Sequence, residues 1–179
     1  MSNDYSFDTT AETEIETQPL NVSEEAAVET ASDGLVSRLK RVYSDVEPVR
    51  TERRFKPFYR FGAVLRKKFL KGDDIVHEGM IVVDASTGVT RPILDQYVET
   101  TTKTVSEDEL LDRDLDGGTA RRKAQRQKLQ TQNRDGGEIE LDTDPDVVFK
   151  PVWLIEFADG NVKAVDGTNG QTYDDMTLV

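Results

Sequence analysis

The 179-residue chain contains no cysteine, one histidine and one tryptophan. Without cysteine it has no disulfide, no thiolate metal site and no cysteine nucleophile. No stretch of the sequence approaches the roughly 18 consecutive apolar residues of a membrane-spanning helix. The first residues carry acids where a signal peptide needs basic residues and then an apolar run. We therefore expect a cytoplasmic protein, or a virion-associated one if a virus encodes it, without membrane contact.

Apolar residues are also scarce. They make up 36% of the chain, and charged residues make up 32%, whereas soluble domains usually have about 45–50% and about 25%. This balance predicts a modest core with long solvated segments. The length fits one domain or two small related halves.

Charge is distributed in three blocks, which are acidic, basic and acidic. Residues 1–34 hold nine acids and no Lys or Arg, while residues 35–71 hold twelve basic residues and three acids. Residues 1–33 are predicted to be a disordered acidic arm, which either is an inert tail or covers the basic stretch as a polyanion mimic. A net charge of −12 with more Arg than Lys is typical of soluble proteins from halophilic organisms, because high salt screens the repulsion between like charges. We therefore expect the gene to come from a halophilic archaeon or from one of its viruses or plasmids.

Two segments of the chain share one pattern, from Lys56 to Gly88 and from Lys150 to Gly170. Both begin with Lys-Pro and an aromatic residue or valine before alternating apolar positions, and both end on Val-Asp-x-x-x-Gly. Alternation of this kind predicts antiparallel hairpin strands. We expect the buried faces of the two hairpins to meet in one shared core, with these principal members: Tyr59, Phe61, Val83, Trp153, Ile155, Phe157 and Val165.

A helix is expected before each hairpin. Apolar residues recur at helical spacing over residues 33–46, and residues 120–132 are strong helix formers. Ser106 and Glu109 form a capping-box pattern. The predicted fold class is α+β, with a first helix-hairpin unit at 34–105 and a second at 106–179, joined in a small sheet and preceded by the arm at 1–33.

A helix followed by paired strands that end in Val-Asp-Ala-Ser-Thr-Gly, residues 83–88, resembles the PepSY-type module, a small cystatin-like α+β unit often found in tandem. The resemblance covers residues 35–92 and, less well, residues 106–173, where residues 165–170 read Val-Asp-Gly-Thr-Asn-Gly. It implies non-enzymatic work, namely inhibition, regulation or assembly through a sheet face or edge.

Basic and aromatic residues alternate in the first hairpin, and this allows two interpretations. They are either a polyanion-binding surface, with aromatic rings that stack on bases, or the solvated side of a strand whose other side is core. The candidate polyanion-binding residues are Arg53, Arg54, Lys56, Arg60, Arg66, Lys67 and Lys68. The first hypothesis for function is an interaction, assembly or regulatory protein with a protein partner, which can include a second copy. The alternative is a nucleic-acid accessory protein that uses residues 38–71 and is gated by the arm.

Catalytic patterns are weak in this sequence. His77 lies in a charged loop without a Ser or Cys partner motif, and no phosphate-binding glycine loop occurs. Asp112, Asp114 and Asp116 match the first half of a calcium loop, but Lys123 stands where a bidentate Glu is needed. These aspartates are either a polar loop or a cation site. We predict a protein that is not an enzyme and has no cofactor.

Overall fold

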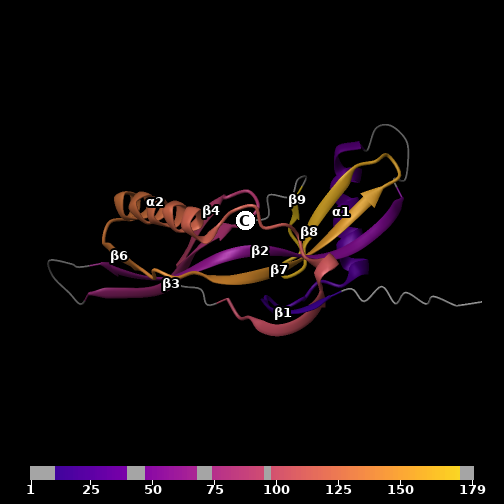
Figure 1. Cartoon of the computed structure of the whole chain (residues 1–179). Helices are drawn as coiled ribbons and strands as arrows, with labels where there is room; N and C mark the ends of the chain where they lie inside the picture. Colours follow the sequence, from indigo (N-terminus) through magenta and orange to yellow (C-terminus); the bar gives the residue numbers. More distant parts are fainter. Residues whose placement is uncertain (1–10, 40–46, 68–73, 95–97, 174–179) are drawn as a thin grey trace, which may run out of the picture.

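The computed structural model describes residues 11–39, 47–67, 74–94 and 98–173, with the backbone alone at 33–39 and 94. Within these ranges, nine strands form one sheet and two α-helices pack on it (Figure 1). The elements are β1 (Glu12–Thr17), α1 (Glu24–Leu39), β2 (Pro48–Lys67), β3 (Ile75–Asp84), β4 (Thr90–Leu94), β5 (Thr101–Ser106), the 3-10 helix η1 (Glu107–Glu109), α2 (Gly117–Asp135), β6 (Glu138–Leu141), β7 (Asp146–Phe157), β8 (Val162–Asp166) and β9 (Thr172–Tyr173).

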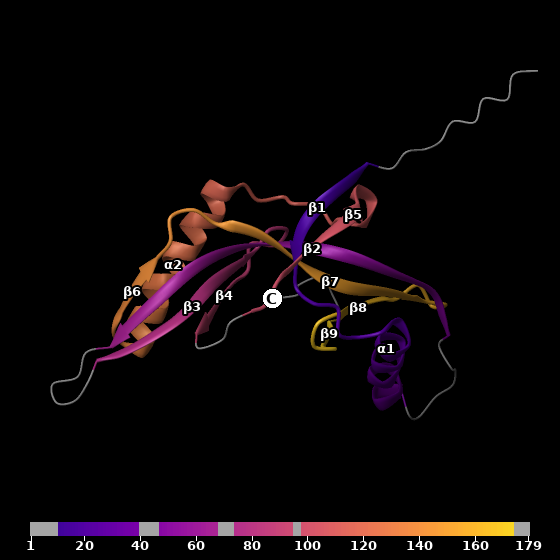
Figure 2. The ribbon, with the colours of Figure 1, turned by 90° about the horizontal axis from the view of Figure 1, so that it is seen from below.

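The centre of the sheet is the antiparallel pair β2–β7, in which Lys56 lies directly opposite Lys150. β3 and β4 continue the sheet beyond β2, while β8 and β9 continue it from β7. β1 joins β7 at one end and pairs along its whole length with β5. Seen from below, β1 crosses the β2–β7 pair (Figure 2). The mixed α/β class with a large sheet and antiparallel hairpins agrees with the predicted fold class.

The apolar core is divided between the two ends of the sheet. One cluster packs β2 and β3 against α2 and includes Phe61 and Val83. A second cluster packs β7 and β8 against α1 and includes Trp153 and Phe157. The prediction of one shared core is therefore wrong, although all seven predicted core residues are buried. The reason is geometric: the two hairpins extend in opposite directions from the antiparallel β2–β7 pair, so each apolar face has a different helix above it.

The acidic N-terminal region is ordered over much of its length. Residues 12–17 form β1, and α1 begins at Glu24, so the prediction of a disordered arm over residues 1–33 is wrong for these segments. The Ser23 hydroxyl accepts a hydrogen bond from the Ala26 amide at 3.2 Å, as an N-terminal cap does. Ala27 and Ala31 are fully buried. Small apolar residues bring this helix close to the sheet, which a search for large apolar side chains misses.

The helix predicted over residues 33–46 is misplaced, because α1 spans Glu24–Leu39 and crosses the expected boundary between arm and first unit. Residues 40–46 and residues 1–10 lie outside the described residues. Neither described helix is long and apolar enough to cross a membrane.

Helix α2 has clear local causes. The Asp116 carboxylate caps it by accepting hydrogen bonds from the Thr119 amide and hydroxyl, both at 2.9 Å. Gly136, at φ +71°, ends the helix. Ala120 and Ala124 are fully buried on the side that faces the sheet, so the helix lies close to the β2–β3 hairpin.

Candidate functional site

Six of the seven predicted polyanion-binding residues lie in β2, and the seventh, Lys68, lies outside the described residues. The arginines of β2 contact carboxylates of this chain. Arg53 Nη2 is 2.7 Å from Glu109 Oε1, and Arg54 Nη2 is 2.6 Å from Glu52 Oε2. These guanidinium groups are therefore engaged within the fold, next to η1 and β2 itself.

The Arg53–Glu109 contact changes the acidity of the carboxyl. Burial disfavours the charged form of Glu109, but hydrogen bonds from Arg53 and the Ser106 amide, together with the charges of Arg53 and Lys103, outweigh it and lower its pKa. The ion pair and the capping box of η1 thus share one carboxylate. This arrangement fixes the end of β5 against β2.

Arg60 joins three strands. Its Nη2 lies 3.0 Å from Glu16 Oε1 in β1 and 3.1 Å from Asp146 Oδ2 in β7. Burial lowers the pKa of the Arg60 guanidinium, but the hydrogen bonds and charges of Asp146 and Glu16 raise it by more, so the group is held charged. The acidic N-terminal region does contact the basic stretch here, as part of the sheet.

Arg66 and Lys67, two further predicted polyanion-binding residues, lie near the end of β2. Arg66 Nη2 is 3.4 Å from Glu140 Oε2 of β6, in a largely exposed pair. Lys67 is half-buried and lies opposite Ile75 of β3. The predicted residues therefore do not gather on one open surface.

Two buried ion pairs flank the centre of the sheet. Lys56 Nζ is 2.6 Å from Asp84 Oδ2, with the side chains only 1% and 0% exposed. Lys150 Nζ is 2.9 Å from Asp166 Oδ2, with the side chains 15% and 0% exposed. Both ammonium groups lie over the ring of Phe58, at 5.8 and 5.7 Å from its centroid. Opposite charge and a ring face compensate for the lost hydration of each lysine.

The two aspartates also organise matching turns. Oδ1 of Asp84 accepts hydrogen bonds from the amides two and three residues further on, at 2.9 and 3.1 Å. Oδ1 of Asp166 does the same at 2.8 and 3.3 Å. Each turn closes at a glycine in the left-handed region, Gly88 at φ +73° and Gly170 at φ +75°. The Val-Asp-x-x-x-Gly pattern is thus explained by one carboxylate that serves a turn and a lysine at once.

Aromatic side chains anchor the segment before each helix. The Tyr59 hydroxyl donates to the carbonyl of Leu115 at 2.7 Å, two residues before α2. The Trp153 indole Nε1 donates to the carbonyl of Val22 at 2.9 Å, two residues before α1. Each hydrogen bond ties a helix entry to the hairpin on which that helix packs.

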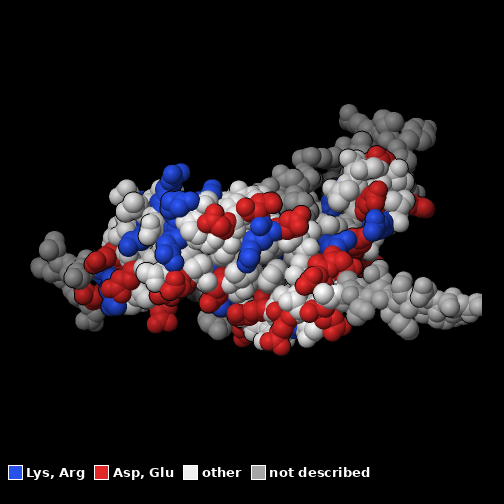
Figure 3. Space-filling view, viewed as in Figure 1, with Lys and Arg blue, Asp and Glu red and all other residues white. Residues whose placement is uncertain are grey.

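Among the described residues, exposed basic side chains are concentrated on α2. From Gly117 to Arg134 the helix carries six Lys or Arg and no acid, although the whole chain has 35 acids. Figure 3 shows Lys and Arg gathered over α2 and acids along the side of β1 and β5. We call its exposed residues the outer face of α2; they are Gly118, Arg122, Gln125, Arg126, Leu129, Gln130, Asn133 and Arg134.

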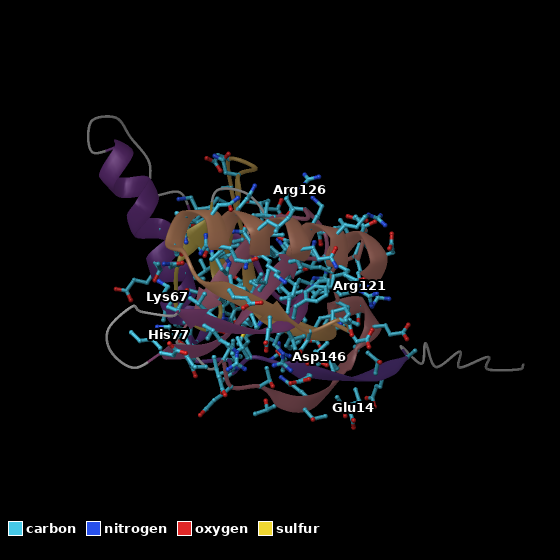
Figure 4. All side chains as sticks on the ribbon, turned by 90° about the vertical axis from the view of Figure 1, so that its left-hand side faces the viewer. Glu14, Lys67, His77, Arg121, Arg126 and Asp146 are labelled. Carbon is cyan, nitrogen blue, oxygen red and sulfur yellow. The ribbon has the colours of Figure 1, made fainter. Side chains whose placement is uncertain are left out.

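Some cations of α2 have partners and others do not. Arg121 Nη2 is 2.9 Å from Asp144 Oδ1, and Arg134 pairs with its neighbour Asp135. Arg122 donates to the Thr119 hydroxyl at 2.8 Å. Within the described ranges no ion pair involves the following cations: Arg122, Lys123, Arg126 and Lys128. In Figure 4, Arg126 lies on the far side of the molecule from Glu14.

Strong helix formers over residues 120–132 predict this helix, but its charge was not singled out. The signal that finds it is the absence of Asp and Glu over 18 residues of an otherwise acidic chain. An exposed helix usually mixes both signs, because pairs three or four residues apart stabilise it. Residues 117–134 of α2 lack such pairs of opposite charge along the helix.

The aspartates before α2 have a structural task. Asp116 is the helix cap, and hydrogen bonds from the Thr119 amide and hydroxyl lower its pKa. Asp112 and Asp114 are exposed. Across the part of the chain that the structure describes, no three His, Asp or Glu side chains are placed to hold a metal ion. His77 lies in β3, opposite Leu65.

Comparisons with known proteins give no relative for this chain. No family model, no curated protein sequence and no solved structure matches it significantly. The resemblance to PepSY-type modules therefore stays a prediction, and the function has to be argued from the contacts and charges of the described residues.

Proposed function

We propose that this protein is a non-enzymatic interaction protein, in which the sheet is a scaffold and the outer face of α2 contacts a negatively charged partner. The observation that carries the proposal is the contrast between two sets of cations. Those of β2 are engaged with carboxylates, as Arg53 and Arg60 are, whereas Arg122 and Arg126 are exposed and form no ion pair among the described residues. Exposed cations outside ion pairs are suited to recognition of a negatively charged partner.

We further propose that the scaffold arose by duplication of a helix-hairpin unit. Its support is the matched set of contacts around Lys56 and Lys150: the same lysine–aspartate pair, the same turn, and an aromatic hydrogen bond to a helix entry in each half. In this proposal each helix packs on the hairpin of the other unit. Because the two units exchange helices in this way, neither unit has a complete core alone.

A PepSY-like origin fits the duplicated unit, and we keep it as part of the proposal because it also implies assembly or regulation without catalysis. The acidic composition supports a halophilic host, cellular or viral, with the protein in the cytoplasm or in a virion. A second copy of the chain is a possible partner within the same proposal.

Site-specific photocrosslinking in cells that carry the gene tests the interaction proposal. A photoreactive residue at Gln125, in the outer face of α2, is expected to give a discrete crosslinked product. The matched control position is Asp159, which is exposed in the β7–β8 turn at the other end of the sheet. Equal products from both positions, or none from Gln125, would contradict the proposal.

A further inference from the structure

We propose that the partner of α2 is a nucleic-acid duplex, whose phosphate backbone the helix contacts from within a groove. The inference rests on the proposed function, since it names the chemistry of the partner for the same surface. A duplex presents a dense, regular row of negative charges, and neutralising them releases counterions. Residues 117–134 of α2 carry six Lys or Arg and no acid, and the carboxylates of Asp116, Asp144 and Asp135 contact the helix near its two ends.

The arrangement of side chains around α2 fits a groove. At about 100° per residue, Arg122, Arg126, Leu129 and Asn133 form the central line of the outer face. Arg121 and Lys128 fall on one flank of this line, while Lys123 and Arg134 fall on the other. A helix in the major groove places its centre on base edges and its flanks near the two phosphate strands.

The dimensions and residue types agree with this docking. Nineteen residues give a helix of about 28 Å at 1.5 Å per residue, long enough to lie along a groove. Gln125, Gln130 and Asn133 are exposed amides, and amides are among the side chains that pair with adenine edges. Leu129, 59% exposed, supplies an apolar contact of the kind that a thymine methyl group accepts.

The rest of the molecule sets the orientation of the duplex. Acids cover the side of β1 and β5 (Figure 3), and Glu14 lies on the opposite side of the sheet from α2 (Figure 4). Phosphates are repelled there, so contact is expected on the α2 side of the sheet. The net charge of −12 then limits the affinity and makes binding strongly dependent on salt.

Fluorescence anisotropy with a labelled mixed-sequence DNA duplex tests the proposal on the full chain. We expect binding at low salt that weakens as salt rises. The double variant Arg122→Gln/Arg126→Gln, which removes the two arginines of the central line, should bind at least about tenfold more weakly.

The control is Arg50→Gln/Arg113→Gln, which removes the same net charge at two exposed arginines outside α2. It should bind the duplex as the wild type does. Absence of wild-type binding at low salt, or equal loss in both double variants, would overturn the proposal. Sedimentation without DNA tests the alternative that a second copy of the chain binds the outer face of α2. Salt-sensitive self-association that only the α2 variant loses would support that alternative and overturn the proposal. A result that overturns duplex binding does not overturn the proposed function, which a crosslink at Gln125 would still support.

Discussion

The buried lysine–aspartate pairs are the residues on which the centre of the sheet depends. Asp84 serves both Lys56 and the turn that follows β3, so one carboxylate connects β2 to the β3–β4 turn. A buried ion pair is weak evidence for net stability, because desolvation offsets much of the attraction. Removing one partner is different, since an uncompensated charge then stays buried.

Lys56→Met should therefore lower the free energy of unfolding by about 3–5 kcal/mol, the usual cost of breaking a buried pair. Lys150→Met should cost less, because Lys150 is 15% exposed where Lys56 is 1% exposed, so this pair lies closer to solvent. Urea unfolding followed by circular dichroism measures both. Equal costs below about 1 kcal/mol, the scale of an exposed pair, would show that these lysines do not stabilise the sheet.

Helices α1 and α2 are held by small residues facing the sheet. Ala27 and Ala31 of α1, and Ala120 and Ala124 of α2, are all fully buried. Alanine lets the helix backbone approach the strands closely, and it favours the helix itself. Each helix entry is also tied down by an aromatic hydrogen bond, from Tyr59 or Trp153.

Enlarging these alanines should overpack the contact. Ala31→Leu and Ala124→Leu are each expected to destabilise the protein by about 1–3 kcal/mol. Leu129→Ala, on the outer face of α2, is the control and should change stability by less than about 0.5 kcal/mol, as exposed positions do. Thermal unfolding of the three variants measures this, and a tolerated leucine at Ala124 would argue against close packing of α2 on the β2–β3 hairpin.

Local patterns in the sequence predict the hairpins well. The alternation around Phe61 and Ile155 corresponds to β2 and β7, because side-chain period decides which face is buried. The first helix is predicted at residues 33–46 but spans Glu24–Leu39, because the residues that contact the sheet are alanines rather than large apolar residues. The pairing of β1 with β5 is long-range, and nothing in the short polar segment Glu12–Thr17 indicates its partner strand.

On the scale of the whole molecule, the charge blocks of the sequence are redistributed by the fold. The acidic N-terminal block meets the basic block where Glu16 pairs with Arg60, and Arg53 and Arg60 link β2 to η1 and to β7. In the part of the chain that the structure describes, exposed basic side chains are concentrated on α2, which lies in an acidic part of the sequence. Charge per segment therefore does not show which cations are exposed, because ion pairs and burial within the fold decide that.

Arginine footprinting of the native protein tests the central claim most directly. The protein is treated briefly with an arginine-selective dicarbonyl reagent, and modified peptides are quantified by mass spectrometry. Arg122 and Arg126 should react fast, and Arg60, whose side chain is 18% exposed, should react slowly until the protein is unfolded. Rapid modification of Arg60 together with protection of Arg122 and Arg126 would contradict the assignment of β2 to the scaffold and α2 to the interaction surface.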